Sequence, residues 1–275
     1  MQLKKKYRFD NKRQIWRIIP SSNGRLFIEE RQPENKEVYF HCLQIDSGKK
    51  ILSNFQLEEK FWVGIEDVHD EIIYFHKFAK PDMPKHRGIF AFDISSKKIL
   101  WQNPDLVFLF RLEDKIISYK EKFEGKNYFS VNAATGEIFN EFGDDHQQIN
   151  ILRNQLSDKT ADGSYLFPEV FDLEQEINNI AKKFIESLRN EFVILGKIEF
   201  ILKNNLLMIS FHQANSSGGM ANYFKAVDLS TGKYILEEII NKDTSLYMTD
   251  SFFIKDNLLF LLFGKTRLVV YGIVD

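Results

Sequence analysis

The stretch FDISSKKILW, residues 92–101, decides the architecture of this chain because variants of it return along the sequence. Each variant has an apolar run, an Asp or Asn, a short polar turn and a second apolar run. The other copies are LQIDSGKKIL at 43–52, VNAATGEIF at 131–139 and VDLSTGKYIL at 227–236. Their anchor residues are Asp46, Asp93, Asn132 and Asp228, which are 47, 39 and 96 residues apart. Recurrence at this period indicates a repeat architecture.

The anchor of each copy has the chemistry of a turn. An Asp or Asn side chain accepts hydrogen bonds from backbone N–H groups two residues further on, and Gly supplies the positive φ of a tight hairpin. Gly48, Gly136 and Gly232 occupy that place in three copies, and Ser95-Ser96 replaces it in the fourth. We therefore interpret the motif as the hairpin between the last two strands of a repeat, with a strained or different turn at 95–96.

Each period contains four short apolar segments of strand length. In the second period they are 61–67, 71–78, 88–94 and 97–102, and in the third they are 106–113, 114–122, 127–133 and 136–142. Four strands in about 40–45 residues are typical of a propeller blade, and the 26 Phe and 10 Tyr residues favour half-buried strands. The sequence predicts an all-β fold: a β-propeller of five blades of four antiparallel strands, or six blades if the long gap hides one.

The two ends of the chain complement each other in this scheme. The C-terminal residues supply three strands without a fourth, and YRFDNKRQIW at 7–16 supplies a strand without the three before it. Pairing these segments completes the last blade and removes two exposed sheet edges, which otherwise favour aggregation. We expect the N-terminal strand to close the ring.

Residues 143–191 break the period. Their polar first part is followed by apolar residues spaced three and four apart, which predicts a helix over 172–191 with a capping box at Asp172 and Gln175. We expect a single domain, residues 1–275, in which 143–191 is a non-repeat insertion. The helix is expected to pack on the flank of blade three or four, with a cap over the channel, a docking surface or a decayed blade as alternatives.

Composition excludes several classes of partner. A net charge of −2 argues against nucleic acid and against an anionic membrane, which both favour a basic excess. No apolar run follows Lys4, Lys5 and Lys6, and no stretch approaches the ~18 apolar residues of a membrane span. The single cysteine, Cys42, cannot form an intramolecular disulfide. These features predict a cytoplasmic protein.

Two histidines occupy matched places in the repeats. His76 and His212 end the second strand of their units, 17 and 16 residues before the anchor, and each begins a predicted loop, 77–88 and 213–222. Matched positions in a ring face the same side, so the two loops are expected to wall one site there. Loops on a rigid scaffold often carry function. The predicted ligand-binding residues are His76, Asp82, His86, Arg87 and His212.

Other polar groups in the sequence give weaker signals. His76, His86 and Asp82 are of types that bind zinc or manganese, but their spacing matches no ligand motif, so we predict no metal and no cofactor. The segment IEDVHDE, 65–71, holds Glu66 and other acidic residues beside a histidine. We interpret it as a solvated hairpin turn, because acid–base catalysis requires a buried carboxyl.

The repeat at Asp93 to Trp101 resembles the blades of propellers related to the pyrroloquinoline-quinone dehydrogenases, as do 46–52 and 228–236. The segment 62–93 is also similar to an uncharacterised bacterial family of propeller-like proteins. The first resemblance implies fold alone. Quinoprotein enzymes have about eight blades, a calcium site and a vicinal disulfide, whereas this chain has fewer blades and one cysteine.

The function that follows is that of a cytoplasmic binding or scaffold protein without catalytic activity, whose protein or small-molecule partner the sequence does not identify. The alternative is a hydrolase or lyase with a His/Asp site, with or without a metal ion, on the face formed by 77–88 and 213–222. Catalysis requires these groups to converge within hydrogen-bond reach.

Overall fold

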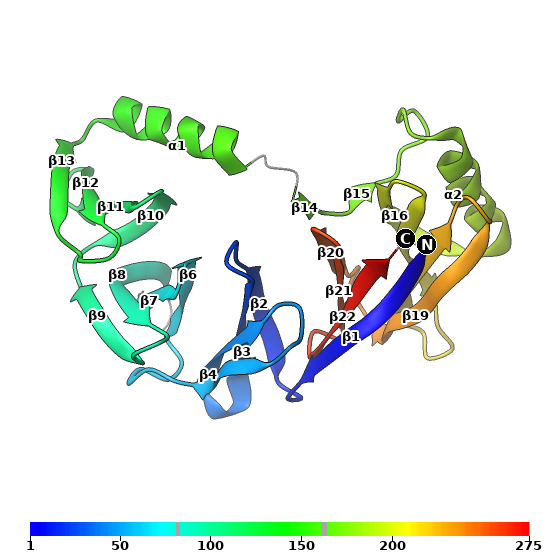
Figure 1. Ribbon diagram of the computed structural model, residues 1–275, viewed down its shortest axis with the longest axis horizontal. Coiled ribbons are helices and arrows are strands. Elements are labelled where there is room, and N and C mark those ends of the chain that lie inside the picture. The colour runs from blue at the N-terminus through cyan, green and yellow to red at the C-terminus, as the bar shows by residue number, and fades with distance from the viewer. Residues whose placement is uncertain (81–82, 161–163, 275) are drawn as a thin grey trace. The chain divides into compact units, whose positions relative to one another are not determined.

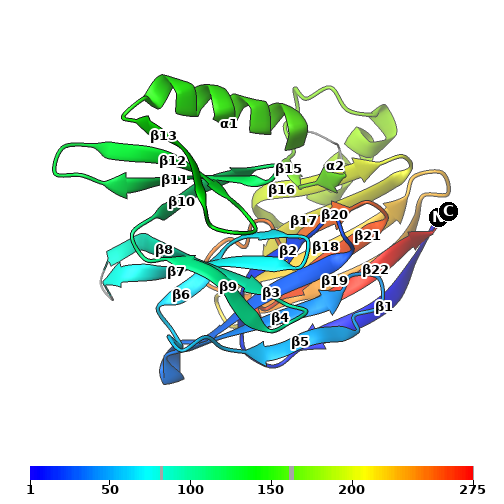
Figure 2. The ribbon, with the colours of Figure 1, turned by 60° about the vertical axis from the view of Figure 1, so that its left-hand side comes forward.

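The computed structural model describes residues 1–80, 83–160 and 164–274, which form five antiparallel sheets and two α-helices (Figures 1 and 2). Contacts divide the chain into two compact units, residues 14–162 and residues 1–13 with 163–275. The first unit contains three sheets and the second contains two. Each unit is built from consecutive up-and-down meanders.

The unit 14–162 contains blades one to three, in which strands adjacent in sequence are adjacent in the sheet. Blade one is β2 (Gln14–Pro20), β3 (Arg25–Gln32), β4 (Glu37–Gln44) and β5 (Lys50–Phe55); blade two is β6 (Val63–His69), β7 (Ile72–Lys80), β8 (Met83–Asp93) and β9 (Lys98–Asn103); blade three is β10 (Val107–Leu112), β11 (Lys115–Glu121), β12 (Lys126–Asn132) and β13 (Ile138–Gly143). In blades two and three these bounds agree with the predicted strands to within a few residues, except that β8 begins earlier.

The second unit contains blades four and five. Blade four is β16 (Ile194–Lys203), β17 (Leu206–Ala214), β18 (Met220–Asp228) and β19 (Lys233–Thr244); blade five is β20 (Phe252–Lys255), β21 (Leu258–Phe263), β22 (Arg267–Val274) and β1 (Gln2–Asp10). Strand β1 runs antiparallel to β22 from Gln2 opposite Val274 to Asp10 opposite Arg267. The N-terminal strand therefore completes the last blade, as predicted.

Five successive four-stranded meanders, the last completed by the first strand of the chain, define a β-propeller of five blades. The described residues of 143–191 contain no sixth sheet. The closing strand begins earlier than the predicted 7–16 and ends at Asp10, because Trp16 already belongs to β2.

Three of the four predicted anchor residues make the turns for which they were identified, whereas in blade one the matching place at the end of the third strand is held by Gln44 and not by Asp46. Asp93 accepts a hydrogen bond from the Ser96 N–H at 2.6 Å, and Asn132 accepts two, from the N–H groups of Ala134 and Thr135. Asp228 accepts two from Ser230, from its N–H and its hydroxyl. In the copy without glycine the positive φ falls at the same place, four residues after the anchor, on Lys97 at 56°. The turn at 95–96 is thus of a kind that costs backbone strain, as expected for a non-glycine residue.

Neighbouring blades in the unit 14–162 interlock through aromatic residues. The rings of Phe40 and Phe75 lie 4.6 Å apart between blades one and two. Between blades two and three, Tyr74 and Trp101 both donate to the Ala133 carbonyl at 3.0 Å. Trp101 also covers Gly136, where a Cβ atom would lie 2.6 Å from the indole. The glycine of one turn therefore serves two needs, positive φ and room for the preceding blade.

The insertion contains more structure than the sequence indicated. Helix α1 (His146–Thr160) lies in the polar first part of the insertion, where no helix was predicted, and its Ile149 packs on the core of blade three. The two-residue strands β14 (Tyr165–Leu166) and β15 (Glu169–Val170) extend the edges of β20 and β16. Figure 1 shows this segment, in pale green, beside the strands that it extends.

The predicted helix is shorter than expected. Helix α2 (Asn179–Glu191) is capped by Asn178, whose side chain accepts from Ile180 and Ala181, so the predicted capping box at Asp172 is wrong. Its apolar stripe packs on blade four, in the core that includes Phe200 and Phe211. The flank position is therefore confirmed. Neither of the helices that the structure describes has a stretch suited to crossing a bilayer.

Candidate functional site

The candidate site of blade two is built around His76 on β7. His76 is opposite Gly64 of β6 and is only 2% exposed. A Cβ atom on Gly64 would lie 2.9 Å from His76 Cε1 and 3.3 Å from the Arg31 guanidinium. Glycine at this position therefore makes room for the imidazole inside the blade.

Glu66 of β6 faces His76 because of an irregularity in the strand. The pairing of β6 with β7 shifts register between Ile65 and Asp67, which leaves Glu66 as the extra residue of a bulge. Its Oε1 atom lies 3.1 Å from His76 Nδ1 and 2.6 Å from His86 Nδ1. The Glu66 side chain is 10% exposed. The prediction that Glu66 belongs to a solvated turn is therefore wrong.

His86 of β8 completes this His–Glu cluster of Glu66, His76 and His86. Its ring stacks face to face on that of His76, with centroids 3.5 Å apart and planes 8° apart. Phe78 stands edge-on to both rings, at 5.0 and 5.5 Å. The three polar side chains come from three consecutive strands and fix one another.

The electrostatics of the cluster favour an ionised carboxylate. Burial raises the pKa of Glu66, but hydrogen bonds and charge from His76 and His86 outweigh it and lower the pKa to about 2. Burial lowers the pKa of His76 below its ordinary value, although Glu66 opposes this shift. At neutral pH Glu66 is therefore an anion, His76 is neutral, and the His86 Nδ1–H donates to the carboxylate.

Two imidazoles and a carboxylate are also a donor set for zinc, manganese or iron, and one donor atom from each residue lies within 4.8 Å of the others. A metal ion binds an imidazole nitrogen along the lone pair in the ring plane. Two nearly parallel planes 3.5 Å apart do not share such a point. The observed arrangement fits a hydrogen bond from His86 to an ionised carboxylate, and a metal would require one ring to turn.

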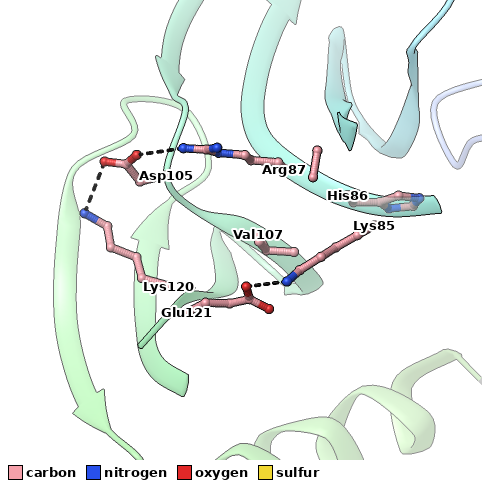
Figure 3. A pocket seen from close by; sticks show the side chains of 8 residues that line it. Lys85, His86, Arg87, Asp105, Val107, Lys120 and Glu121 are labelled. Atoms are coloured by element: carbon pink, nitrogen blue, oxygen red, sulfur yellow. Dashed lines mark hydrogen bonds and ion pairs between the residues drawn. The ribbon is translucent and has the colours of Figure 1, made fainter. Parts of the chain in front are cut away.

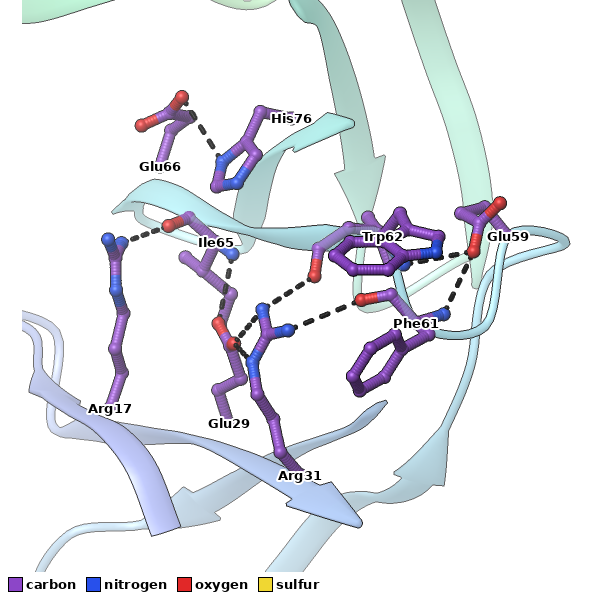
Figure 4. Close-up of polar contacts among 10 residues, drawn as sticks. Arg17, Glu29, Arg31, Glu59, Phe61, Trp62, Ile65, Glu66 and His76 are labelled. Atoms are coloured by element: carbon purple, nitrogen blue, oxygen red, sulfur yellow. Dashed lines mark hydrogen bonds and ion pairs between the residues drawn. The ribbon is translucent and has the colours of Figure 1, made fainter. Parts of the chain in front are cut away.

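Blade one holds the strand that carries Glu66. Arg31 of β3 donates to the carbonyls of Val63 at 2.9 Å and Phe61 at 3.3 Å, and its Nε donates to Glu29 at 2.8 Å. The second oxygen of Glu29 accepts from the Ile65 N–H at 3.1 Å. Figure 4 shows these bonds converging on the segment beside His76. Glu29 is 1% exposed, so this buried pair fixes the bulge from the neighbouring blade.

Beside His86 lies a charged cleft of about 360 Å³. It is lined by Ala79, Lys85, His86, Arg87, Asp105, Val107, Lys120 and Glu121, from blades two and three. Figure 3 shows Lys85 paired with Glu121, and Asp105 between Arg87 and Lys120. The distances from Asp105 to these two cations are 3.8 and 3.9 Å, so neither forms a hydrogen bond with it.

The structure brings together three of the five predicted site residues. His76, His86 and Arg87 lie on β7 and β8, whereas His212 belongs to the other unit and Asp82 lies outside the described residues. The predicted loops are shorter than expected. Pairs such as Phe78 with His86, and Ala214 with Met220, extend the hairpins through most of 77–88 and half of 213–222, which leaves a turn at 215–219.

Comparison with known proteins gives limited matches. The model of a family described as "Domain of unknown function (DUF4905)" matches residues 19–101, which include the His–Glu cluster. Among curated protein sequences none matches the chain.

Solved structures with some likeness have low identity. Pyrococcus horikoshii acylaminoacyl peptidase is 8% identical, with 92% of this chain covered and a TM-score of 0.33. Kluyveromyces lactis Hsv2 is 11% identical, with 96% of this chain and 74% of that chain covered and a TM-score of 0.31. The Dos1 propeller is 8% identical, with 94% of this chain and 68% of that chain covered and a TM-score of 0.32. The chain spans 36% of the peptidase. The fold assignment rests on the order and number of the sheets.

Proposed function

We propose that this protein is a binding protein without catalytic activity, and that its charged cleft holds an acidic peptide segment of a protein partner. The observation that carries the proposal is the sharing of Asp105 by two cations. Arg87 and Lys120 both approach one carboxylate without reaching hydrogen-bond distance. Each retains donors for an incoming carboxylate.

The charge balance of the cleft favours an anion. Lys85, Arg87 and Lys120 face the carboxylates of Asp105 and Glu121, which leaves one cation in excess. The Arg87 side chain is 61% exposed, and a guanidinium binds carboxylates in a fixed, two-pronged geometry. An acidic side chain of a partner therefore meets a donor that is already in place.

A peptide suits the surroundings of the cleft better than a small anion does. Phe123 lies in the turn after β11, two residues beyond Glu121, and is 102% exposed. Exposed aromatic side chains beside charged groups are frequent anchors in protein interfaces. A segment that combines acidic and apolar residues would contact both features.

The His–Glu cluster supports a structural role better than a catalytic one. Its carboxylate is held by His86, and His76 is enclosed by Gly64 and Phe78. A general base requires access to the proton that it removes, and His76 is buried. We assign to the cluster the task of fixing β8, which presents His86 and Arg87 to the cleft.

Fluorescence anisotropy with a labelled peptide of alternating Glu and Leu tests this proposal. We expect binding that weakens as salt rises, and a loss of about tenfold in the double variant Arg87→Glu, Lys120→Glu, since each exposed charge pair contributes about 0.5–1 kcal/mol. Lys233→Glu, on exposed β19, has the same sign of change and is expected to leave affinity unaltered. Equal losses of affinity in the double variant and in Lys233→Glu, or binding that does not depend on salt, would refute the proposal that the cleft binds the peptide.

Three further proposals rest on the sequence alone. They are a cytoplasmic location, a single domain over residues 1–275, and a kinship of the repeats with the quinoprotein type.

A further inference from the structure

A second pocket lies in the other unit, against blade four. Its volume is about 390 Å³, within the range of small-molecule sites. Its walls include Val170 of β15, Glu199 of β16, Ser210 and His212 of β17, and Tyr247 and Met248 before β20. The two-residue strand β15 thus forms one side of the pocket, in the insertion that interrupts the repeats.

Glu199 is the unusual group in this pocket. It is 7% exposed, and its Oε2 atom has no hydrogen-bond partner among the described residues. Burial raises the pKa of Glu199, and repulsion by Asp250 adds to the shift, although the Asp250 backbone N–H opposes it. A buried carboxyl oxygen without a donor is costly. Its persistence next to a cavity indicates that its partner comes from outside the chain.

The polar neighbours of Glu199 are engaged elsewhere. The Ser210 hydroxyl, opposite Glu199 in the sheet, donates to Asn222 at 2.8 Å. His212 Nε2 accepts the Met248 N–H at 3.0 Å, and burial lowers the pKa of His212, so this ring adds no positive charge at neutral pH. Lys197 also lines the pocket, but its side chain is exposed.

The remaining walls define the rest of the ligand. Val170, Tyr247 and Met248 are apolar or aromatic, and Tyr247 stands edge-on to His212 at 5.4 Å. A ligand that fits must therefore bury an apolar body and present one donor group to a carboxyl oxygen. A basic nitrogen supplies both a hydrogen-bond donor for Glu199 and a positive charge that balances the carboxylates of Glu199 and Asp250.

We propose that the blade-four pocket binds a small organic cation, an aromatic or aliphatic body that carries one ammonium or amidinium group paired with Glu199. The charged cleft takes no part in this site, and the opposite ligand charge keeps the two proposals separate. Binding here would give the protein a small-molecule ligand in addition to its acidic partner.

Three probes of one shape test the inference: phenethylamine, 2-phenylethanol and 3-phenylpropionate, each titrated by ligand-observed NMR. We expect the amine to bind about tenfold or more tightly than the alcohol, because a hydrogen bond between two charged groups is stronger than one from a neutral hydroxyl. The carboxylate should bind least. Glu199→Gln should abolish the preference for the amine and leave the affinity for the alcohol unchanged.

The controls separate recognition from folding. Glu191→Gln, at the exposed end of α2, should leave the preference unchanged. Thermal unfolding of Glu199→Gln should occur at the same or a higher temperature than that of the native protein, since the variant removes an unpaired buried carboxyl. The inference is overturned if no probe binds, if amine and alcohol bind equally, or if Glu199→Gln retains the preference.

Discussion

The substitution Glu66→Gln is expected to destabilise the protein in a pH-dependent way. It keeps the size of the side chain and removes the charge that His76 and His86 hold. The pKa of Glu66 falls from 4.5 to about 2 in the folded protein, and each pKa unit corresponds to about 1.4 kcal/mol. Because the folded-state pKa is depressed, the stability that this group contributes is present above pH 4.5 and is lost as the pH falls through 2.

These values give a contribution of about 3 kcal/mol at pH 5 and roughly half of that at pH 3. Urea unfolding of the native protein and of Glu66→Gln, at both pH values, measures the difference. Glu71→Gln is the matched control, because Glu71 pairs with Arg25 at 2.8 Å with both side chains partly exposed. Such a pair contributes about 1 kcal/mol or less. An equal loss for Glu66→Gln at pH 5 and pH 3 would show that shape, and not charge, holds the cluster.

Three other changes test the fold and the cluster. Gly136→Ala is expected to lower the free energy of unfolding in urea by about 2 kcal/mol or more, because its Cβ would clash with Trp101 and its φ is 77°. The control Gly125→Ala has a φ of 90° but open space around the Cβ, so it should lower that free energy by about 1 kcal/mol. Equal losses in the two variants would show that the contact with Trp101 does not contribute. Asn178→Ala should cost about 1 kcal/mol and reduce helical circular dichroism, since it removes the cap of α2; an unchanged midpoint would contradict the cap. Zinc titration followed by imidazole NMR should leave the His–Glu cluster unchanged, and one tightly bound equivalent of zinc would contradict the hydrogen-bonded arrangement.

The sequence predicted the architecture because its signals are local. Asp93, Asn132 and Asp228 bond to amides two or three residues away, so the turn chemistry can be recognised in a single copy. Four such turns mark four of the blades. The N-terminal segment then remains as a strand without a blade of its own, which predicts that it completes the last blade. Helix α1 was missed because only one of its described residues, Ile149, is a buried hydrophobic side chain, which gives almost no periodic signal.

The site was only partly predictable because it depends on register. Glu66 becomes buried through a bulge, and the pairings of β2 and β10 skip Trp16 and Leu109 in the same way. The three skipped residues are chemically unrelated, so no pattern in the sequence marks the bulge. Gly64 was the available signal, since a glycine inside a strand often indicates close approach of another group.

The two predicted histidines show how one repeat position can have different chemistry. His76 and His212 lie at matched places on β7 and β17, opposite Gly64 and Leu195, and the register of each preceding strand shifts close by. By register Glu199, opposite Ser210, corresponds to Asp67, opposite Tyr74, and not to Glu66. In blade two, His86 donates to the carboxylate of Glu66, and His76 Nδ1 lies 3.1 Å from the same oxygen. In blade four, His212 Nε2 accepts a hydrogen bond from the Met248 N–H. Among the described residues no group donates a hydrogen bond to Glu199 Oε2. The repeat therefore supplies a histidine in both blades, and the group that contacts it differs: the carboxylate of Glu66 in blade two and the backbone N–H of Met248 in blade four.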